Sequence, residues 1–165
     1  MVTVLSPAKR ILPPPAAPPF LTQPLFLNQA ATIAAEMAHY SPQKLETLLA
    51  ANQKLALEAY CAYQDFSAQR PGSAALLSFH GLAFDHLGAA AFESEDFLFA
   101  QDHLRIFSAL YGLLRPADGI LPYRLDLAGK VRLNQKNLYA FWGKKVYEAL
   151  FEEGEQVLHL ASAEY

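Results

Sequence analysis

The chain has 165 residues, of which 53% are apolar and 18% are charged, proportions that suit one globular domain and exclude disorder along the whole length. A net charge of −3 does not by itself point to a polyanionic partner, and a chain of this size needs neither disulfides nor a structural metal to form a core. The lone Cys61 and the lack of a long apolar run or leader pattern predict a cytoplasmic protein without a membrane span.

The first half of the chain predicts one strand, one proline-rich loop and three helices. The apolar run Val2–Leu5 predicts a buried first strand that ends at Ser6. Six of the 11 prolines fall within residues 13–24, so an extended surface loop is expected there. Ser41 is a typical N-cap residue before Pro42. The helical patterns cover residues 27–40, 41–52 and 53–66.

The second half alternates strand and helix patterns. Residues 74–79 predict a buried strand, and residues 94–112 predict a long helix that Gly112 ends. The other expected elements are a short helix at 82–92, strands at 123–127, 130–133 and 156–160, and a helix at 138–151. This alternation predicts a single mixed α/β domain over residues 1–165, with a mixed sheet surrounded by helices.

Charge is distributed unevenly along the chain. Residues 1–104 hold 5 basic and 9 acidic groups, residues 105–145 hold 8 basic and 2 acidic groups, and residues 146–165 hold 5 acidic groups and none that are basic. Aromatic residues are interleaved with the basic groups of the middle segment, which makes polyanions plausible partners. The alternative is a solvated face whose acidic partners come from the flanking segments.

Motifs for catalysis or metal binding are missing from the sequence. There is no GxSxG elbow, no glycine-rich phosphate loop, no HExxH and no cysteine pair. His80, Asp85 and His86 come nearest to a metal cluster, but helical spacing does not make them converge. Cys61 lies among apolar neighbours and is predicted to be a buried structural thiol. We therefore predict no catalytic residue, no metal and no cofactor.

The passage with most chemical content runs from Arg105 to Pro116. A helix that stops at Gly112, a turn with free backbone amides and flanking arginines would hold a phosphate, reading the backbone of a nucleic acid and not its bases. The alternative is that Gly112 only caps the helix and that Arg115 pairs with Asp118.

Two further segments carry cations beside possible ligand groups. Lys9 and Arg10 follow the first strand directly, a place where α/β domains often present ligand-binding groups. Tyr123 with Arg124 combines a ring with a cation, although an aromatic residue at this position is at least as often part of the core.

Motifs spread over nearly the whole chain resemble, in the same order, those of the YaaA family of bacterial peroxide stress resistance proteins. The motifs are Leu5-Ser6-Pro7-Ala8-Lys9, Phe79-His80-Gly81, residues 99–105, residues 110–118, Pro122-Tyr123-Arg124-Leu125, residues 138–142 and residues 160–165.

The resemblance implies a cytoplasmic bacterial protein with a mixed α/β fold that limits oxidative damage by lowering free intracellular iron. It also implies sequence-independent binding of double-stranded DNA through a basic cleft and a helix-hairpin-helix-like element, which we place at residues 111–116. The residues expected to contact DNA are Lys9, Arg10, Arg105, Tyr111, Gly112, Arg115, Tyr123 and Arg124.

The sequence also departs from the family pattern. Family members usually continue past Tyr165 through a basic segment, so the chain is expected to lack the C-terminal part of the family domain and to expose the edge of its last strand. Phe84 stands where relatives often carry tyrosine.

Two other functions stay open. One is an enzyme that acts on a small anionic or phosphorylated substrate in the basic cleft, with Tyr111 or His80 as the proton carrier. The other is direct iron sequestration by His80, Asp85, His86 and carboxylates.

Overall fold

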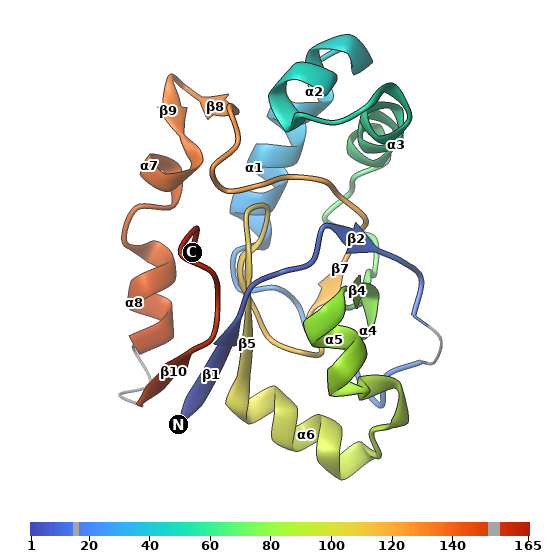
Figure 1. The fold of residues 1–165 in the computed structure, drawn as a ribbon, viewed down its shortest axis with the longest axis vertical. Coiled ribbons are helices and arrows are strands. Elements are labelled where there is room, and N and C mark those ends of the chain that lie inside the picture. The colour runs from blue at the N-terminus through green and yellow to red at the C-terminus, as the bar shows by residue number, and fades with distance from the viewer. Residues whose placement is uncertain (15–16, 152–155) are drawn as a thin grey trace.

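A four-stranded mixed sheet lies at the centre of the computed structural model, which describes residues 1–14, 17–151 and 156–165 (Figure 1). The strand order is β10-β1-β5-β6; β1 pairs in parallel with both β10 and β5, and β5 pairs antiparallel with β6. The strands are β1 (Val2–Leu5), β5 (Leu104–Ser108), β6 (Gly112–Leu114) and β10 (Val157–His159). The predicted mixed α/β class is therefore confirmed.

Three two-stranded ladders and several short helices surround this sheet in the described residues. The ladders are β2 (Arg10–Ile11) with β4 (Phe79–His80), β3 (Ser73–Ala74) with β7 (Gly119–Ile120), and β8 (Arg132–Leu133) with β9 (Lys136–Asn137). The helices are α1 (Leu27–Ala38), α2 (Pro42–Leu49), α3 (Gln53–Gln64), α4 (Ala75–Ser78), α5 (Leu82–Leu87), η1 (Ala89–Ala91), α6 (Ser94–His103), α7 (Leu138–Trp142) and α8 (Lys145–Phe151). Figure 1 shows α1 to α3 at one end of the molecule, α6 at the other, α8 beside β10, and α7 between α8 and the β8–β9 ladder.

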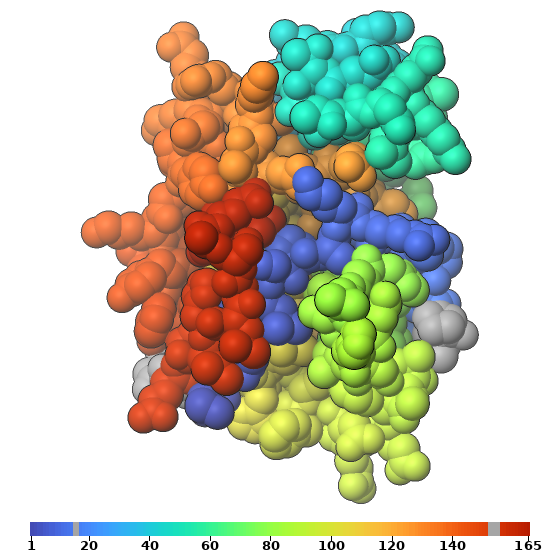
Figure 2. Space-filling view, viewed as in Figure 1, coloured from blue at the N-terminus to red at the C-terminus, as the bar shows by residue number. Residues whose placement is uncertain are grey.

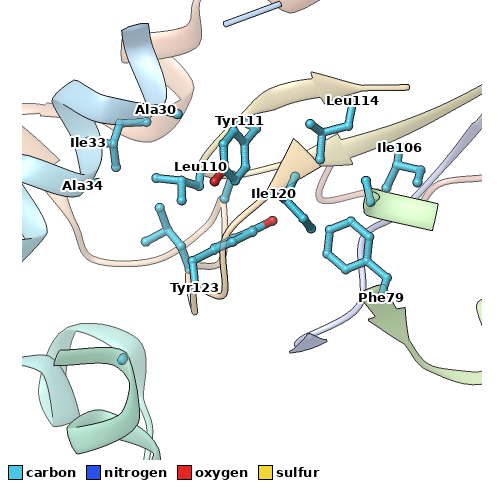
Figure 3. Packing of buried hydrophobic residues seen from close by; sticks show 14 of the residues in the cluster. Ala30, Ile33, Ala34, Phe79, Ile106, Leu110, Tyr111, Leu114, Ile120 and Tyr123 are labelled. Carbon is cyan, nitrogen blue, oxygen red and sulfur yellow. The ribbon is translucent and has the colours of Figure 1, made fainter. Parts of the chain in front are cut away.

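The main core lies where α1 meets the β5–β6 hairpin and the chain after β7. Leu110, Tyr111 and Leu114 are no more than 1% exposed, and Figure 3 shows them packed with Ile33 and Tyr123. A second core, on Val2, Val4, Phe107, Leu113 and Leu150, is built from alternate positions of β1 and β5–β6 together with α8. The central strands are therefore buried on both faces.

Local signals place the helices of the first half. The Ser41 hydroxyl accepts a hydrogen bond from the Lys44 N–H at 3.3 Å, with Pro42 at the start of α2, and Asn52 accepts one from the Leu55 N–H at 2.9 Å at the start of α3. The predicted proline-rich loop contains no helix in its described part, and its residues 15–16 lie outside the described residues.

The predicted long helix over residues 94–112 is correct only as far as His103. Residues 104–108 form β5, because a short, largely buried segment such as Leu-Arg-Ile-Phe-Ser also suits a strand and here it pairs with β1. Gly112 does not end a helix; it begins β6, which pairs back onto β5. The segment 111–116, where we expected a helix-hairpin-helix-like element, therefore belongs to a β-hairpin and the turn after it.

Other expectations require correction. Residues 74–79 hold the short helix α4 between β3 and β4 and not one strand; an apolar run alone does not separate buried helix from strand. Residues 123–127 form no strand, and the predicted helix 138–151 is divided into α7 and α8 at Gly143, whose φ is 53°. Cys61 is exposed and not buried, because the apolar face of α3 turns its neighbours inward.

Within the described residues, no helix combines the length and the apolar character that crossing a lipid bilayer requires.

Gly112 carries the clearest backbone requirement in the fold. Its φ is +74°, and a Cβ there would lie 2.8 Å from the Trp142 ring and 3.0 Å from Phe26. Trp142 cannot easily withdraw, since its Nε1 donates to the Ala109 carbonyl at 3.0 Å. A side chain at this position would therefore meet backbone strain and a packing clash together.

We expect Gly112→Ala to lower the free energy of unfolding by roughly 2–5 kcal/mol, the sum of left-handed strain and overpacking. Gly88→Ala is the matched control, because Gly88 has a φ of +64° but nothing within 4 Å of the added Cβ. The control should lose only about 1–2 kcal/mol. Urea unfolding measures both, and equal losses would show that packing against Trp142 contributes nothing.

Candidate functional site

A cavity of about 770 Å³ lies between β2, α3 and the chain that follows β7. Four cationic side chains line it, with Glu58 as the one acidic lining residue. We call it the basic cavity. Its lining residues are Lys9, Arg10, Ile11, Leu12, Asn52, Lys54, Leu55, Glu58, Ala59, Ala62, Pro122, Tyr123 and Arg124. Figure 2 shows the N-terminal segment, in blue, at the surface between α2–α3 in cyan and α5 in green.

Strand β2 and the residue before it carry two of the cations, Arg10 and Lys9. Arg10 pairs with His80 of β4 in the antiparallel ladder, and the Leu12 N–H donates to the Ser78 carbonyl at 2.9 Å, so the backbone of this segment is held while Arg10 stays exposed. Lys9 Nζ donates to Asp126 Oδ2 at 2.8 Å, yet 65% of its side chain remains exposed. Both cations are therefore presented to solvent from a fixed backbone.

Tyr63 of α3 forms a hydrogen bond with residues 122–124, the segment of the lining that follows β7. Its hydroxyl donates to the Arg124 carbonyl at 2.7 Å, and burial raises the pKa of this tyrosine, so the hydroxyl keeps its proton. Arg124 is half-buried, and its Nε has no hydrogen-bond partner among the described residues. Because a buried donor without a partner is costly, an acceptor brought by a ligand would stabilise this side chain.

A smaller cavity of about 100 Å³ adjoins the basic cavity and shares Lys9, Tyr123 and Arg124 with it. The end of the chain closes it: the Ser162 N–H donates to Ser6 Oγ at 2.8 Å, and Tyr165 belongs to its lining. Motif segments from the start, middle and end of the sequence thus meet at one place.

Arg105 lies elsewhere, although the sequence put it in the same site. It is 7% exposed, and its Nη1 donates to the carbonyls of Gln101 at 3.0 Å and Leu104 at 2.9 Å. These contacts close the C-terminal end of α6, where carbonyls lack partners within the helix. Arg105 therefore supports the helix and does not line the basic cavity.

Arg115 pairs with Asp118, as the alternative reading of that segment proposed. Arg115 Nη2 lies 3.3 Å from Asp118 Oδ1, and the Arg115 N–H donates to Oδ2 at 2.8 Å. Thr22 also donates to Oδ1, at 2.7 Å. Burial raises the pKa of the Asp118 carboxyl, although these hydrogen bonds oppose the rise. Arg115 is half-buried and lies outside the lining of the basic cavity.

Tyr111 and Tyr123 put their hydroxyls into the core. Tyr111 is 1% exposed and its oxygen accepts from the Leu121 N–H at 3.0 Å, while Tyr123 Oη lies 2.7 Å from Ser108 Oγ. Burial raises the pKa of Tyr111 to about 12, which suits it poorly to proton transfer near neutral pH. Tyr111 and Gly112 lie outside the lining of the basic cavity, whereas Tyr123 is one of its lining residues.

The histidine cluster is only partly assembled. His80 Nδ1 lies 3.9 Å from Asp85 Oδ1, but His86 Nδ1 interacts with the Leu82 carbonyl at 2.8 Å instead. His80 Nε2 is buried without a hydrogen-bond partner in the described part of the chain. Across residues 1–14, 17–151 and 156–165, no three His, Cys, Asp or Glu side chains are grouped as metal ligands would be.

The structure adds Lys54 to the site and separates the basic residues of the 105–145 segment. Lys54 lies in the first turn of α3, and its neighbour Asn52 could be recognised as a helix cap, but only the packing of α3 brings this turn near β2. Lys136 and Lys145 line a different cavity, of about 480 Å³, beside α1. The basic residues of the 105–145 segment are therefore divided between different parts of the structure.

Comparisons with known proteins find similarity over the whole length of this chain. The sequence model of the family described as "Peroxide stress protein YaaA" matches residues 1–165. A UPF0246 protein of Lactiplantibacillus plantarum is 37% identical over 166 residues, covering 100% of this chain and 67% of the relative. For UPF0246 proteins of Agathobacter rectalis and Burkholderia mallei the identities are 31% and 38%, over 100% of this chain and 67% and 68% of the relatives.

We expect Tyr123→Phe to lower the free energy of unfolding by about 1 kcal/mol, because Ser108 Oγ loses a buried partner. Tyr139→Phe is the control: its hydroxyl donates to the Glu164 carbonyl at 2.9 Å at an exposed position, so its loss should cost less. Chemical denaturation compares the two. An equal cost for both variants would contradict a structural role for the buried hydroxyl.

Asp118 should make stability depend on pH in the acid range. Because its folded-state pKa lies above the ordinary 3.8, the folded chain holds this proton more tightly than the unfolded chain. The free energy of unfolding therefore falls as the pH rises from 3.8 through the folded-state pKa. Asp118→Asn removes this titration and should flatten that part of the profile. Urea unfolding at steps between about pH 4 and 7 tests it; identical slopes would disprove it.

Proposed function

The chain belongs to the family of peroxide stress protein YaaA, and from this membership we propose that it binds the phosphate backbone of double-stranded DNA at the basic cavity. The observation that carries the proposal is the gathering of Lys9, Arg10, Lys54 and Arg124, from three separate segments, around one cavity with a single acidic lining residue. Lysine and arginine contacts to phosphates supply most sequence-independent affinity for DNA.

The charge distribution supports the same partner. The chain as a whole has a net charge of −3, so a cluster of four cations is a local departure and not a consequence of an overall basic composition. Such a cluster attracts a polyanion even where the chain as a whole is acidic. DNA is therefore expected to approach from the side of β2 and α3.

This proposal changes which predicted residues touch DNA. Lys9, Arg10 and Arg124 line the basic cavity, and Lys54 joins them. Tyr123 also belongs to the lining, although it is buried and its hydroxyl is bonded to Ser108. The other four predicted residues lie outside the lining: Arg105, Tyr111 and Gly112 are buried, and Arg115 is paired with Asp118. In this proposal these residues support the protein core next to the basic cavity and do not themselves contact DNA.

Limitation of free iron and a cytoplasmic location stay predictions that accompany DNA binding. Their source is the resemblance to the family, whereas DNA binding has support in the arrangement of cations at the basic cavity. Peroxide damages DNA through iron, so a protein bound to the backbone would stand where that damage occurs.

A second candidate is an enzyme for a small phosphorylated substrate. The volume of about 770 Å³ favours it, because small-molecule sites commonly fall between about 300 and 1,000 Å³. Such an enzyme would show a rise in melting temperature that saturates with a small phosphorylated compound and persists at moderate salt. A chain that showed this shift and bound no DNA would contradict the DNA-binding proposal.

Arg10→Glu is expected to weaken binding to a labelled DNA duplex roughly uniformly across sequences and to reduce the slope of log affinity against log salt by about 1. Arg132→Glu is the matched control, since Arg132 is exposed but lies outside the basic cavity, on β8. Fluorescence anisotropy at graded salt measures both.

Three results would count against this site. Binding that ignores salt would exclude a phosphate contact. A larger loss in Arg132→Glu than in Arg10→Glu would move the interface to the 105–145 segment. Equal binding by Arg10→Glu and the unmodified chain would remove Arg10 from the contact.

A further inference from the structure

We infer that the basic cavity holds one unstacked nucleotide of the bound DNA, with its phosphate on the cationic rim and its base against an apolar wall. The inference rests on the proposed function and adds to it what the protein contacts besides the backbone. It also predicts a preference: DNA in which a base is already unpaired should bind more tightly than fully paired DNA.

The first support is the shape of the site. A phosphate backbone that lies on a surface is contacted by exposed side chains and needs no hollow. Here the cations surround a cavity of about 770 Å³, within the range of roughly 300–1,000 Å³ that holds small organic ligands. One nucleotide is the unit of DNA that enters a cavity of this size.

The second support is the apolar part of the lining. Leu55, Ala59 and Ala62 of α3 form one wall together with Pro122 and Ile11. These side chains have no charge and no hydrogen-bond donor for a phosphate, but they can bury the face of a base that has left the stack. A site for phosphate alone would not need this wall.

Arg124 supplies the third support. Its Nε is buried without a hydrogen-bond partner in the described residues, and the Tyr63 hydroxyl bond fixes the backbone that carries it. An arginine fork matches the oxygens of a phosphate and also the acceptors on the edge of a base. Arg124 lines the cavity, and a turn of its guanidinium group toward a bound nucleotide would give this donor the acceptor that it lacks.

The wall is also firmly built. The Asn52 cap holds the first turn of α3, and Tyr63 anchors its last turn to the chain after β7. Ala59 and Ala62 are small residues spaced three apart, so they lie on the same face of the helix and leave the cavity open. Enlarging one of them fills the cavity without removing a cation.

The test uses a duplex that carries 2-aminopurine either in a mismatch or in a correct pair. This base becomes more fluorescent when it leaves the stack. We expect fluorescence to rise on binding, and the mismatched duplex to bind at least roughly tenfold more tightly than the paired one, because less pairing must be broken. Anisotropy of a separately labelled duplex gives the two affinities.

Ala62→Trp should abolish the fluorescence rise and the mismatch preference while it keeps salt-dependent binding to the paired duplex. Cys61→Trp is the matched control, because Cys61 is exposed on the same helix and does not line the cavity. If Ala62→Trp does not fold by circular dichroism, Ala62→Leu is the smaller filling variant to measure.

The outcomes separate the two proposals. Binding to the paired duplex with no fluorescence rise and no mismatch preference would overturn the inference and leave DNA binding intact. Loss of binding to every duplex would contradict both. A filled cavity that still shows the full fluorescence rise would place the unstacked base elsewhere and overturn the inference. Binding of a labelled free mononucleotide without any DNA binding would assign the cavity to a small molecule instead.

Discussion

The parallel pairing of β1 with β5 is the constraint on which the rest of the structure depends. It aligns Thr3, Val4 and Leu5 with Leu104, Arg105 and Ile106, so the first residues of the chain are held by residues about a hundred positions away. Side chains alternate along these strands: Val2 and Val4 face α8, while Ile106 and Leu114 face the main core. A slip by one residue would exchange the two sets, so that each core would receive the side chains that fit the other.

That pairing also fixes where Lys9 and Arg10 lie. Because β1 ends at Leu5 inside a rigid sheet, the next residues leave it at a fixed point, and the β2–β4 ladder then holds Arg10 beside His80. Lys9 and Arg10 therefore line the cavity from a segment whose backbone is paired with β4. Tyr63 sets the opposite side by its hydrogen bond to the Arg124 carbonyl. The backbone of Arg10 and that of Arg124 are thus held by strand pairing and by a tyrosine hydrogen bond, and not by interactions of their charged groups.

The arrangement separates two tasks of the charged residues. Arg105 and the Arg115–Asp118 pair complete hydrogen bonds of buried backbone and turns, where an unsatisfied group would be costly. Arg10 and Lys54 remain exposed at the basic cavity, and Lys9 is also exposed there although it is ion-paired with Asp126. Buried charges thus complete the frame of the fold, and exposed charges remain at the basic cavity.

Sequence by itself determined the mixed α/β class, the family, and those elements that local chemistry encodes, such as the capped starts of α2 and α3. It also predicted Lys9, Arg10 and Arg124 as binding residues, and all three line the basic cavity. The tertiary structure alone decided that residues 104–108 form a strand, since a short buried apolar run suits either helix or strand until a partner such as β1 is present. It alone added Lys54 and moved Arg105 and Arg115 away from the cavity. Burial and pairing across long sequence separations set which charges face solvent, and no local pattern contains that information.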